Sequence, residues 1–441
     1  MQILVIGSGG REHALAWKSS LDESVTRVFV APGNAGTALE QKITNIPIDT
    51  NDFAEVENFC RKENIGLVII GPEQPLVDGM SDYLHDKGIK TFGPSQAAAQ
   101  LEGSKTFSKD FFIKYGIPTA AYAAFKSYDE SLDYLNTINY PTVVKADGLA
   151  AGKGVIICNN KGEAISALDS IFKDQAFGDA GSSVVIEEFL KGEEASFIAV
   201  VSKDKIIPLA TSQDHKAVGE GDIGLNTGGM GAYSPAPIVD ERIHEKIINE
   251  VMEPTMQGLI SEGSPYLGFL YAGLMIKDGE LKVLEFNCRF GDPETQPIML
   301  RLKSSLVELC LAAINNEMDI VNVEWTEQHS CGVVESTAMS LLPRDGVIGV
   351  VQPDGITSDE EIKHWNSLGV SILSTTISPS DNTLAELGEA TQSLVAKGAD
   401  LIVLDCLAFG RDHWRLVREL TGKPVILPIS LLGKILDEAY G

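Results

Sequence analysis

Three short apolar segments near the start of the chain each run directly into a turn rich in glycine or proline. Residues 3–6 lead into the glycines of residues 7–10, residues 25–30 into residues 31–34, and residues 67–70 into Gly71 and Pro72. Continuous apolar strands are typical of a parallel sheet that is covered on both faces. Such sheets bind ligands at the carboxyl ends of their strands. The pattern therefore predicts a doubly wound, mainly parallel sheet at the start of the chain.

The turn after the first strand is a candidate phosphate site. Gly9 and Gly10 would let an anion approach backbone N–H groups at the start of a helix, and Arg11 would add a charged donor. A purely structural turn explains the same glycines. A nicotinamide cofactor is disfavoured, because the second strand runs into Ala31 and Pro32 where a dinucleotide fold needs an acidic residue.

Residues 145–154 form the sharpest motif, in which one lysine ends an apolar strand and a second lies in a glycine-rich loop. Lys145 would be fixed by the strand, whereas Lys153 would move with the loop. Two cations in this arrangement can clamp a triphosphate while the loop excludes water. The spacing does not fit a Walker loop, in which Gly-Lys-Ser/Thr leads into a helix. A surface loop with solvated lysines is the alternative interpretation.

A strand over residues 284–289 carries a candidate metal site. Glu285 and Asn287 are two residues apart, so both point to the same face of the strand. A carboxylate and an amide oxygen suit Mg²⁺ that is held mainly by substrate phosphates. Arg289 continues this face and could neutralise charge on a phosphoryl group in transfer. The alternative is the solvated polar face of an antiparallel sheet.

Other polar segments are compatible with binding of a nucleotide and a small zwitterion. Residues 184–190 run from an apolar strand into carboxylates and could read an adenine edge, although an exposed strand end explains them equally. Residues 213–216, 226–231 and 289–294 are polar or rich in glycine, and are typical of loops that hold small zwitterions or of tight turns. We interpret His215 as a structural histidine rather than a base.

Composition excludes several classes of partner. Aspartate and glutamate number 62 against 35 lysines and arginines, a net charge of −27, so the surface should repel nucleic acids. The six cysteines are scattered without a Cys-x-x-Cys pair, which indicates reduced thiols and no zinc site. No apolar run approaches the roughly 20 residues that span a bilayer, and the first residues read as a strand rather than a signal peptide. We therefore expect a cytoplasmic protein with neither nucleic-acid nor membrane partners.

Taken together, residues 1–334 resemble the phosphoribosylamine–glycine ligases, or glycinamide ribonucleotide synthetases, of the ATP-grasp superfamily. The motifs that carry the resemblance are residues 7–13, 71–73, 102–105, 145–154, 187–194, 212–216, 226–235 and 285–297. The resemblance implies an α/β and α+β multidomain protein, with a doubly wound pre-ATP-grasp domain over residues 1–102 and an ATP-grasp domain over residues 103–335. It also implies ATP-dependent ligation of glycine to 5-phosphoribosylamine in purine biosynthesis, through a glycyl phosphate, by a monomer.

The same resemblance implies a role for each residue of the site. Lys105, Lys145 and Lys153 would meet the ATP phosphates. Residues Glu187, Glu188 and Leu190 would meet adenine, and Glu194 would meet ribose. Glu285 and Asn287 would hold Mg²⁺ or Mn²⁺. The turn of Gly9, Gly10 and Arg11 would take the phosphate of phosphoribosylamine. The residues around glycine and the acyl phosphate would be Asp214, Asn226, Gly228, Gly229 and Arg289, with Arg289 and Lys153 as the catalytic cations.

The last part of the chain departs from this family. Residues 336–441 alternate short apolar strands with helical stretches, where the resemblance implies a small β-rich domain. Residues 398–407 and 422–428 are similar to the second half of AroM-like proteins, which are relatives of aspartate/glutamate racemases. We interpret Cys406 there as buried and inert. The first hypothesis is an active ligase with an atypical C-terminal domain. The alternatives are an ATP-binding protein whose ligation is impaired by the replacement, and a tail with a ligand of its own.

Overall fold

In its computed structural model the chain forms two units, Met1–Gly332 and Val333–Gly441, and each is described by itself. The structure describes residues 1–150, 154–174, 176–219, 223–333, 347–353, 371–377, 383–404, 411–423 and 425–426. Within these residues, no helix is long and apolar enough to cross a membrane.

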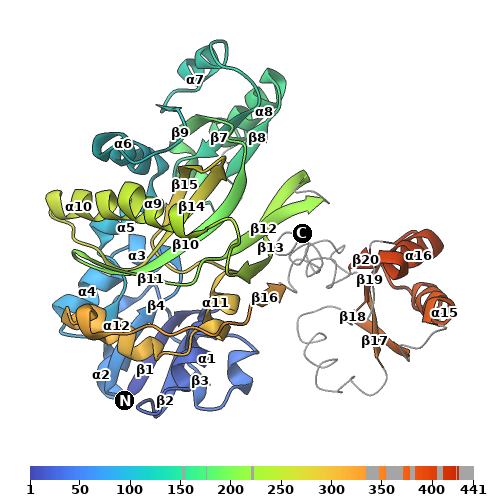
Figure 1. The fold of residues 1–441 in the computed structure, drawn as a ribbon, viewed down its shortest axis with the longest axis horizontal. Helices are drawn as coiled ribbons and strands as arrows, with labels where there is room; N and C mark the ends of the chain where they lie inside the picture. The colour runs from blue at the N-terminus through green and yellow to red at the C-terminus, as the bar shows by residue number, and fades with distance from the viewer. Residues whose placement is uncertain are drawn as a thin grey trace. The chain divides into compact units, whose positions relative to one another are not determined.

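The chain begins with a five-stranded parallel sheet in the order β3-β2-β1-β4-β5, drawn in blue in Figure 1. Its strands are β1 (Gln2–Gly7), β2 (Arg27–Pro32), β3 (Ile43–Asn45), β4 (Ile65–Ile70) and β5 (Thr91–Phe92). The accompanying helices are α1 (Gly10–Ser20), η1 (Thr37–Leu39), α2 (Phe53–Lys62), α3 (Glu73–Val77), α4 (Met80–Asp86) and α5 (Gln96–Gly103).

Strand β1 explains why this sheet is buried on both faces. Leu4 and Ile6 belong to one apolar cluster, whereas Ile3 and Val5 belong to another, and all four are fully buried. Because neighbouring side chains point to opposite faces, each face has its own core. The prediction of a doubly wound parallel sheet is confirmed. The chain order reverses at β1, so the ends of β1 and β4 flank the crevice where such folds bind ligands.

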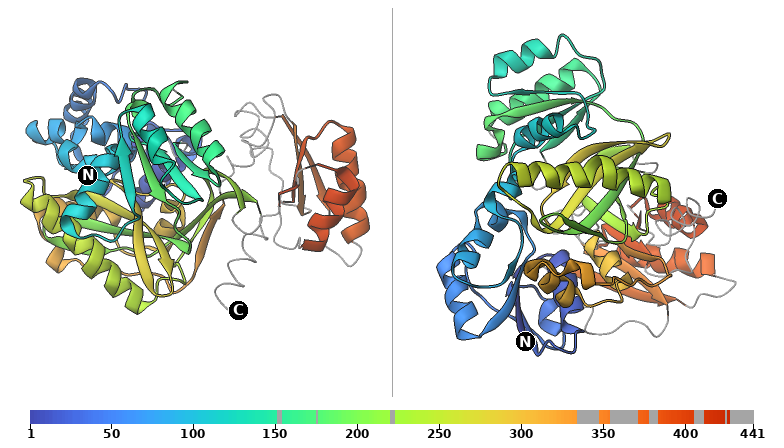
Figure 2. Two further views of the ribbon diagram at one scale, coloured as in Figure 1. Left: turned by 90° about the horizontal axis from the view of Figure 1, so that it is seen from above. Right: turned by 60° about the vertical axis from the view of Figure 1, so that its left-hand side comes forward.

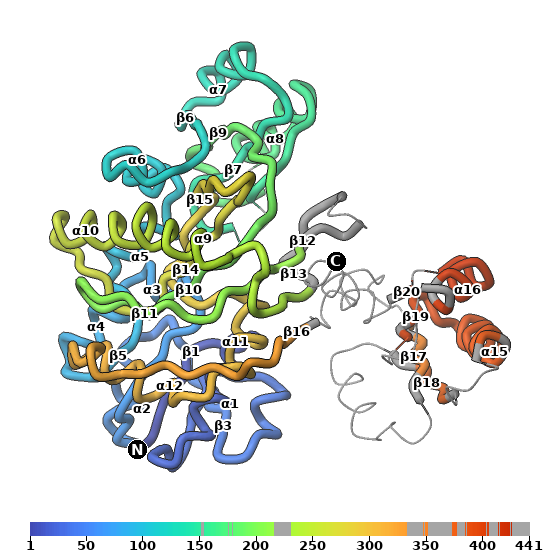
Figure 3. The backbone as a smooth tube through the Cα atoms, in the orientation of Figure 1, coloured from blue at the N-terminus to red at the C-terminus, as the bar shows by residue number. Residues whose placement is uncertain are grey.

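A second, antiparallel sheet has the order β6-β9-β7-β8. Figure 3 traces the chain from β5 through α5 and α6 into this sheet. Its strands are β6 (Tyr122–Phe125), β7 (Thr142–Ala146), β8 (Val155–Cys158) and β9 (Val184–Glu188). The helices of this part are α6 (Lys105–Tyr115), α7 (Tyr128–Tyr134), α8 (Lys161–Phe172) and η2 (Gly178–Ser182). Helix α6 starts where it does because the Ser104 side chain accepts the N–H of Phe107 as an N-cap.

A third, antiparallel sheet has the order β11-β10-β14-β15, and a smaller sheet has the order β12-β13-β16. Their strands are β10 (Glu193–Ser202), β11 (Lys205–Pro208), β12 (Gln213–Gly219), β13 (Ile223–Ser234), β14 (Leu267–Lys277), β15 (Glu280–Asn287) and β16 (Ser330–Val333). The helices are α9 (Glu241–Ile247), η3 (Ile248–Met252), α10 (Glu253–Ser261), α11 (Thr295–Arg301), α12 (Leu306–Asn315) and η4 (Met318–Ile320). Figure 2 shows α9 and α10 running across the sheet β11-β10-β14-β15.

The second unit contains a four-stranded parallel sheet in the order β18-β17-β19-β20. Its elements are β17 (Val347–Pro353), β18 (Ser371–Ile377), α15 (Thr383–Ala396), β19 (Leu401–Leu404), α16 (Arg411–Thr421) and β20 (Val425–Ile426). A small core forms where Val351, Ile402 and Leu404 of the strands meet Leu387 and Val417 of the helices. The expected βα alternation in the tail is confirmed.

Candidate functional site

One cavity of about 460 Å³ in the first unit brings together most of the residues predicted from sequence. The predicted residues that line it are Arg11, Lys105, Lys145, Glu187, Glu188, Leu190, Glu194, Asp214, Glu285, Asn287 and Arg289. They come from helices α1 and α6, from both four-stranded antiparallel sheets of the first unit with the segments that follow their strands, and from β12. A cavity of this size is typical of sites for small molecules.

Two lysines bring positive charge to the cavity from different elements. Lys105 begins helix α6, and its Nζ donates to the carbonyl oxygens of Gly148 at 2.9 Å and Asp147 at 3.3 Å. Lys145 lies on β7, with its Nζ 3.0 Å from Oε1 of Glu187. Burial lowers the pKa of Lys105, and Glu285 partly opposes that effect. A charged phosphate in the cavity would relieve this desolvation by pairing with the ammonium group.

Asp147 ties the start of α6 to the beginning of the glycine-rich segment. Its carboxylate accepts the backbone N–H of Thr106 at 2.6 Å and the hydroxyl of Ser183 at 2.8 Å, together with the hydroxyl of Ser104. The backbone N–H of Lys105 donates to the Asp147 carbonyl at 3.0 Å. The position of Lys105 is therefore set by Asp147, the residue that directly follows β7.

In residues 187–190, the segment predicted to contact adenine, the carboxylates of Glu187 and Glu188 both pair with other protein groups. The Glu187 carboxylate is buried and lies between the ammonium groups of Lys145 and Lys109. Glu188 accepts the N–H of Ala121 and pairs with Lys282. The parts of this segment left for a base are its backbone and the side chains of Phe189 and Leu190, which line the cavity. Glu194 lies farther along, exposed at the cavity.

Glu285 and Asn287 share one face of β15, as the alternation of the sequence predicts. Glu285 lies opposite Gly273 on β14, whose lack of a side chain leaves room above the strand. In the part of the chain that the structure describes, no three His, Cys, Asp or Glu residues gather as a ready metal site. One carboxylate and one amide oxygen therefore fit a hard cation whose remaining ligands are phosphates and water.

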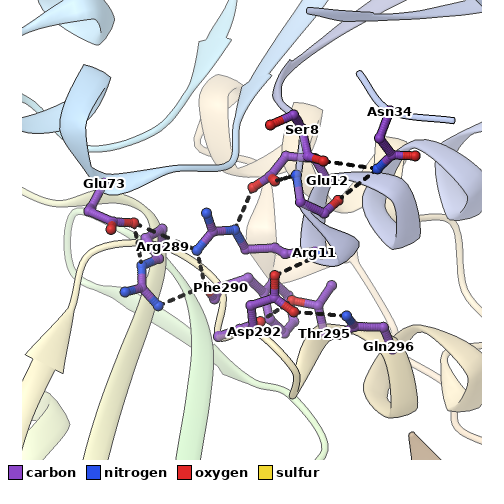
Figure 4. Close-up of polar contacts among 12 residues, drawn as sticks. Ser8, Arg11, Glu12, Asn34, Glu73, Arg289, Phe290, Asp292, Thr295 and Gln296 are labelled. Atoms are coloured by element: carbon purple, nitrogen blue, oxygen red, sulfur yellow. Dashed lines mark hydrogen bonds and ion pairs between the residues drawn. The ribbon is translucent and has the colours of Figure 1, made fainter. Parts of the chain in front are cut away.

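Arg289 and Arg11 meet around Glu73, the first residue of helix α3 (Figure 4). Glu73 Oε2 lies 3.3 Å from Arg289 Nε and 3.8 Å from Arg11 Nη1, and both guanidinium groups donate to the carbonyl oxygen of Phe290. Arg289 Nη2 also lies 2.7 Å from Glu102 Oε1. Burial pushes the pKa of Glu73 upward, but Arg289 and Arg11 outweigh it and hold that pKa below its usual value. The cluster joins the parallel sheet to β15.

The turn predicted to bind phosphate is occupied by carboxylates in this structure. The N–H of Gly9 donates to Glu12 Oε2 at 2.6 Å. The N–H of Arg11 donates to Asp292 Oδ2 at 3.3 Å, as Figure 4 shows. A methyl group on Gly71 would come within 2.1 Å of Glu12, so the Glu12 carboxylate fills the space beneath the turn. A phosphate at Gly9 and Gly10 would therefore compete with Asp292 for the start of α1.

Several predicted residues cannot be placed in the site. Lys153 and Cys406 lie outside the described residues. Asn226, Gly228 and Gly229 lie on β13, where the backbone of Asn226 pairs with Ala217. The structure describes the backbone of Asn226 but not its side chain.

Four cavity or near-cavity residues were missing from the predicted set: Glu73, Glu102, Lys109 and Asp147. Lys109 lies one helical turn after Lys105 on α6, so both face the cavity. That spacing was a signal in the sequence. Glu73 and Glu102 also stand in motifs noted there, but their pairing with Arg289 depends on how distant elements pack.

Comparison with known proteins decides the family. Residues 1–102 match the phosphoribosylglycinamide synthetase N domain, and residues 103–295 match its ATP-grasp (A) domain. The chain is 58% identical to the phosphoribosylamine–glycine ligase of Vibrio parahaemolyticus over 335 aligned residues. The aligned region covers 76% of this chain and 78% of that protein. The chain belongs to the phosphoribosylamine–glycine ligase family. The corresponding protein of Allochromatium vinosum is 59% identical over the same shares of both chains.

Solved structures agree with the ligase family. The crystal structure of phosphoribosylamine–glycine ligase from Thermotoga maritima is 34% identical, with a TM-score of 0.64, over 76% of this chain and 80% of that one. The biotin carboxylase domain of 2-oxoglutarate carboxylase from Hydrogenobacter thermophilus, at 14% identity and a TM-score of 0.60, shares the fold over 75% of this chain and 73% of that one. The predicted resemblance and fold class are both confirmed.

The C-terminal part does not continue the ligase family. Residues 307–440 match the AroM protein family, so the second predicted resemblance is confirmed as well. That match begins inside helix α12, whereas the structure divides between Gly332 and Val333, close to the predicted boundary near residue 335. The end of the ligase unit therefore lies within the segment matched to AroM.

Proposed function

We propose that this chain ligates glycine to 5-phosphoribosylamine, with the conversion of ATP to ADP and phosphate, giving glycinamide ribonucleotide for purine biosynthesis. The observation that carries the proposal is the meeting of Lys105 and Lys145 with Glu285, Asn287 and Arg289 around one cavity. Family membership supports the same activity. The proposed substrates are small molecules, and neither nucleic acid nor membrane takes part.

The cations of the cavity would position the nucleotide. Lys105 and Lys145 approach the cavity from α6 and β7, so their ammonium groups could hold a triphosphate between them. Lys153 would add a third cation. Residues 187–190 would contact adenine through backbone and apolar groups, with Glu188 at their edge, and Glu194 would accept hydrogen bonds from ribose hydroxyls.

Glu285 and Asn287 would hold the divalent cation, for which we propose Mg²⁺ or Mn²⁺. When bound, such an ion neutralises charge on the phosphates that it bridges. The proposal is supported by the oxygen donors of both side chains and by their shared face on β15.

The chemistry proceeds in two displacements. A carboxylate oxygen of glycine attacks the γ-phosphorus of ATP, and the bond to the ADP oxygen breaks, giving glycyl phosphate. The amine nitrogen of phosphoribosylamine then attacks the glycyl carbonyl carbon, and inorganic phosphate leaves.

Arg289 would stabilise charge at the acyl phosphate. Glycine would be positioned by Asp214, Asn226, Gly228 and Gly229. The turn of Gly9, Gly10 and Arg11 would bind the phosphate of phosphoribosylamine after the Asp292 carboxylate moves away from the N–H of Arg11.

We propose three segments: a pre-ATP-grasp domain at residues 1–102, an ATP-grasp domain at 103–335 and an atypical domain at 336–441. We further propose a monomer acting in the cytoplasm. A second candidate is an ATP-binding protein with impaired ligation. The observation that favours it is that the matched region leaves about a fifth of the Vibrio relative uncovered, while the tail has a parallel βα sheet.

The test is release of ADP by the full chain with Mg²⁺, glycine and freshly generated phosphoribosylamine, omitting each substrate in turn. Ligation predicts release only when both substrates are present, and its loss in Lys145→Ala and Glu285→Ala. ATP binding without substrate-dependent release would instead establish the second candidate. Absence of ATP binding would contradict both.

A further inference from the structure

The Glu187 carboxylate holds two lysines that come from different elements. Its Oε1 lies 3.0 Å from Nζ of Lys145 on β7, and its Oε2 lies 3.1 Å from Nζ of Lys109 on α6. The three side chains are at most 7% exposed. Each carboxylate oxygen therefore has one ammonium group as its ion-pair partner, and the three groups form a buried triad with Glu187 at its centre.

The triad is also joined to the strand that carries Glu285. Lys109 Nζ donates to Thr119 Oγ1 at 2.7 Å, and that hydroxyl donates to the carbonyl oxygen of Val283 at 2.8 Å. Lys145 Nζ donates to the carbonyl oxygen of Leu284 at 3.3 Å. Val283 and Leu284 directly precede Glu285 on β15. The triad thus links the two antiparallel sheets that line the cavity.

Stability is a weak reason for such an arrangement. Removing two ammonium groups and a carboxylate from water is costly, and apolar residues of similar volume often serve a core equally well. Burial lowers the pKa of Lys109 to about 8 even though Glu187 opposes the shift. All three groups line the cavity together with Lys105, so the arrangement is best explained by what it does to the charge there.

We propose that Lys109 is a positioning residue, which holds Glu187 so that the Lys145 ammonium group is fixed against the nucleotide phosphates. The inference rests on the proposed function, because it takes Lys145 as a phosphate ligand. Lys109 acts through Glu187, since its own Nζ is engaged by Glu187 and Thr119. Without Lys109, Glu187 would have only Lys145 to pair with, and would draw it away from the phosphates.

The test compares Lys109→Met, Lys109→Arg and a control, Lys114→Met, in the full chain. Lys114 lies on the same helix but is exposed and pairs with Glu262. We expect Lys109→Met to weaken binding of Mg²⁺-ATP by about tenfold or more, measured by calorimetry, as the loss of a charge-assisted hydrogen bond predicts. The KM for glycine should stay unchanged. Lys109→Arg should recover part of the affinity, and Lys114→Met should bind as wild type.

A double-mutant cycle with Lys145→Met separates positioning from general packing. If Lys109 acts through Lys145, its substitution costs little further affinity once Lys145 is gone. Additive losses, or an unchanged dissociation constant in Lys109→Met, would overturn the inference while leaving the ligase proposal intact. If wild-type protein does not bind ATP, both fail. Should Lys109→Met not fold, Glu187→Gln is measured instead and must show the same coupling to Lys145.

Discussion

Glu73 Oε2 lies 3.3 Å from Arg289 Nε, which joins the start of helix α3, just after β4 of the parallel sheet, to the segment that follows β15. These residues are more than two hundred positions apart, yet the ion pair places an arginine proposed for phosphoryl transfer beside the crevice of the first sheet. Glu102 pairs with the same guanidinium group. The two carboxylates hold Arg289 from the side of the first sheet, so its orientation depends on how the sheets pack.

The pairing of Glu102 with Arg289 should be important for stability. Glu102→Gln keeps an acceptor for the N–H of Cys288 but removes the charge that faces Arg289. Breaking a buried ion pair predicts a loss of about 3 kcal/mol in the free energy of unfolding, measured by urea titration. Glu262→Gln, which breaks an exposed pair with Lys114, is the control and should cost less than about 1 kcal/mol. Equal losses in the two variants would contradict this account of Arg289.

Asp147 should control ATP affinity through Lys105. Asp147→Asn weakens the acceptor that holds the N–H of Thr106 and the hydroxyl of Ser183. We expect the dissociation constant for ATP to rise by about tenfold while the KM for glycine is unchanged. Asp174→Asn, at an exposed aspartate beyond helix α8, serves as the matched control. An effect on glycine alone would show that Asp147 does not act through the nucleotide site.

The buried ammonium group of Lys109 predicts a pH dependence of stability. Its pKa of about 8 lies below the ordinary value of 10.5, so between these values the unfolded chain binds more protons than the folded one. Lys109 therefore raises the free energy of unfolding as the pH increases from about 8 to 10.5, by up to about 3 kcal/mol. Lys109→Met should lack this contribution. The measurement is the difference in unfolding free energy between the two proteins across that range, and a constant difference would refute the prediction.

Removal of the divalent cation should abolish turnover and leave the fold intact. Glu285 and Asn287 contribute oxygen ligands from one strand face and are not part of a larger metal cluster among the described residues. EDTA should stop ADP release reversibly, and the far-ultraviolet circular dichroism should not change. Glu285→Gln should require at least about tenfold more Mg²⁺ for half-maximal activity. A variant with an unaltered Mg²⁺ requirement would place the ion elsewhere.

Local patterns were sufficient to predict the fold and several of the residues that line the cavity. The apolar run of β1 and its glycine turn predict the parallel sheet, and the alternation along β15 predicts that Glu285 and Asn287 share a face. Partners in distant elements could not be predicted in this way. The Glu187 carboxylate lies between Lys109 and Lys145, a pairing that the sequence does not predict, because α6 and β7 converge on it from different parts of the chain.

The glycine turn at the start of α1 shows the same limit. The expected turn forms, but its backbone N–H groups are already paired with carboxylates. The N–H of Gly9 donates to Glu12, one turn along the helix, and the N–H of Arg11 donates to Asp292 from the segment after β15. The sequence of the turn contains no sign of the second acceptor. Which anion occupies a helix N-terminus depends on tertiary packing as well as on the glycines.

The most direct test of ligation follows oxygen from glycine into phosphate. The full chain is incubated with ATP, Mg²⁺, phosphoribosylamine and glycine labelled with ¹⁸O in its carboxylate, and the released phosphate is analysed by mass spectrometry. Reaction through glycyl phosphate predicts one ¹⁸O atom in each phosphate released from fully labelled glycine, together with formation of glycinamide ribonucleotide. Phosphate released without ¹⁸O would show that ATP is hydrolysed by water, and would contradict the proposed ligation.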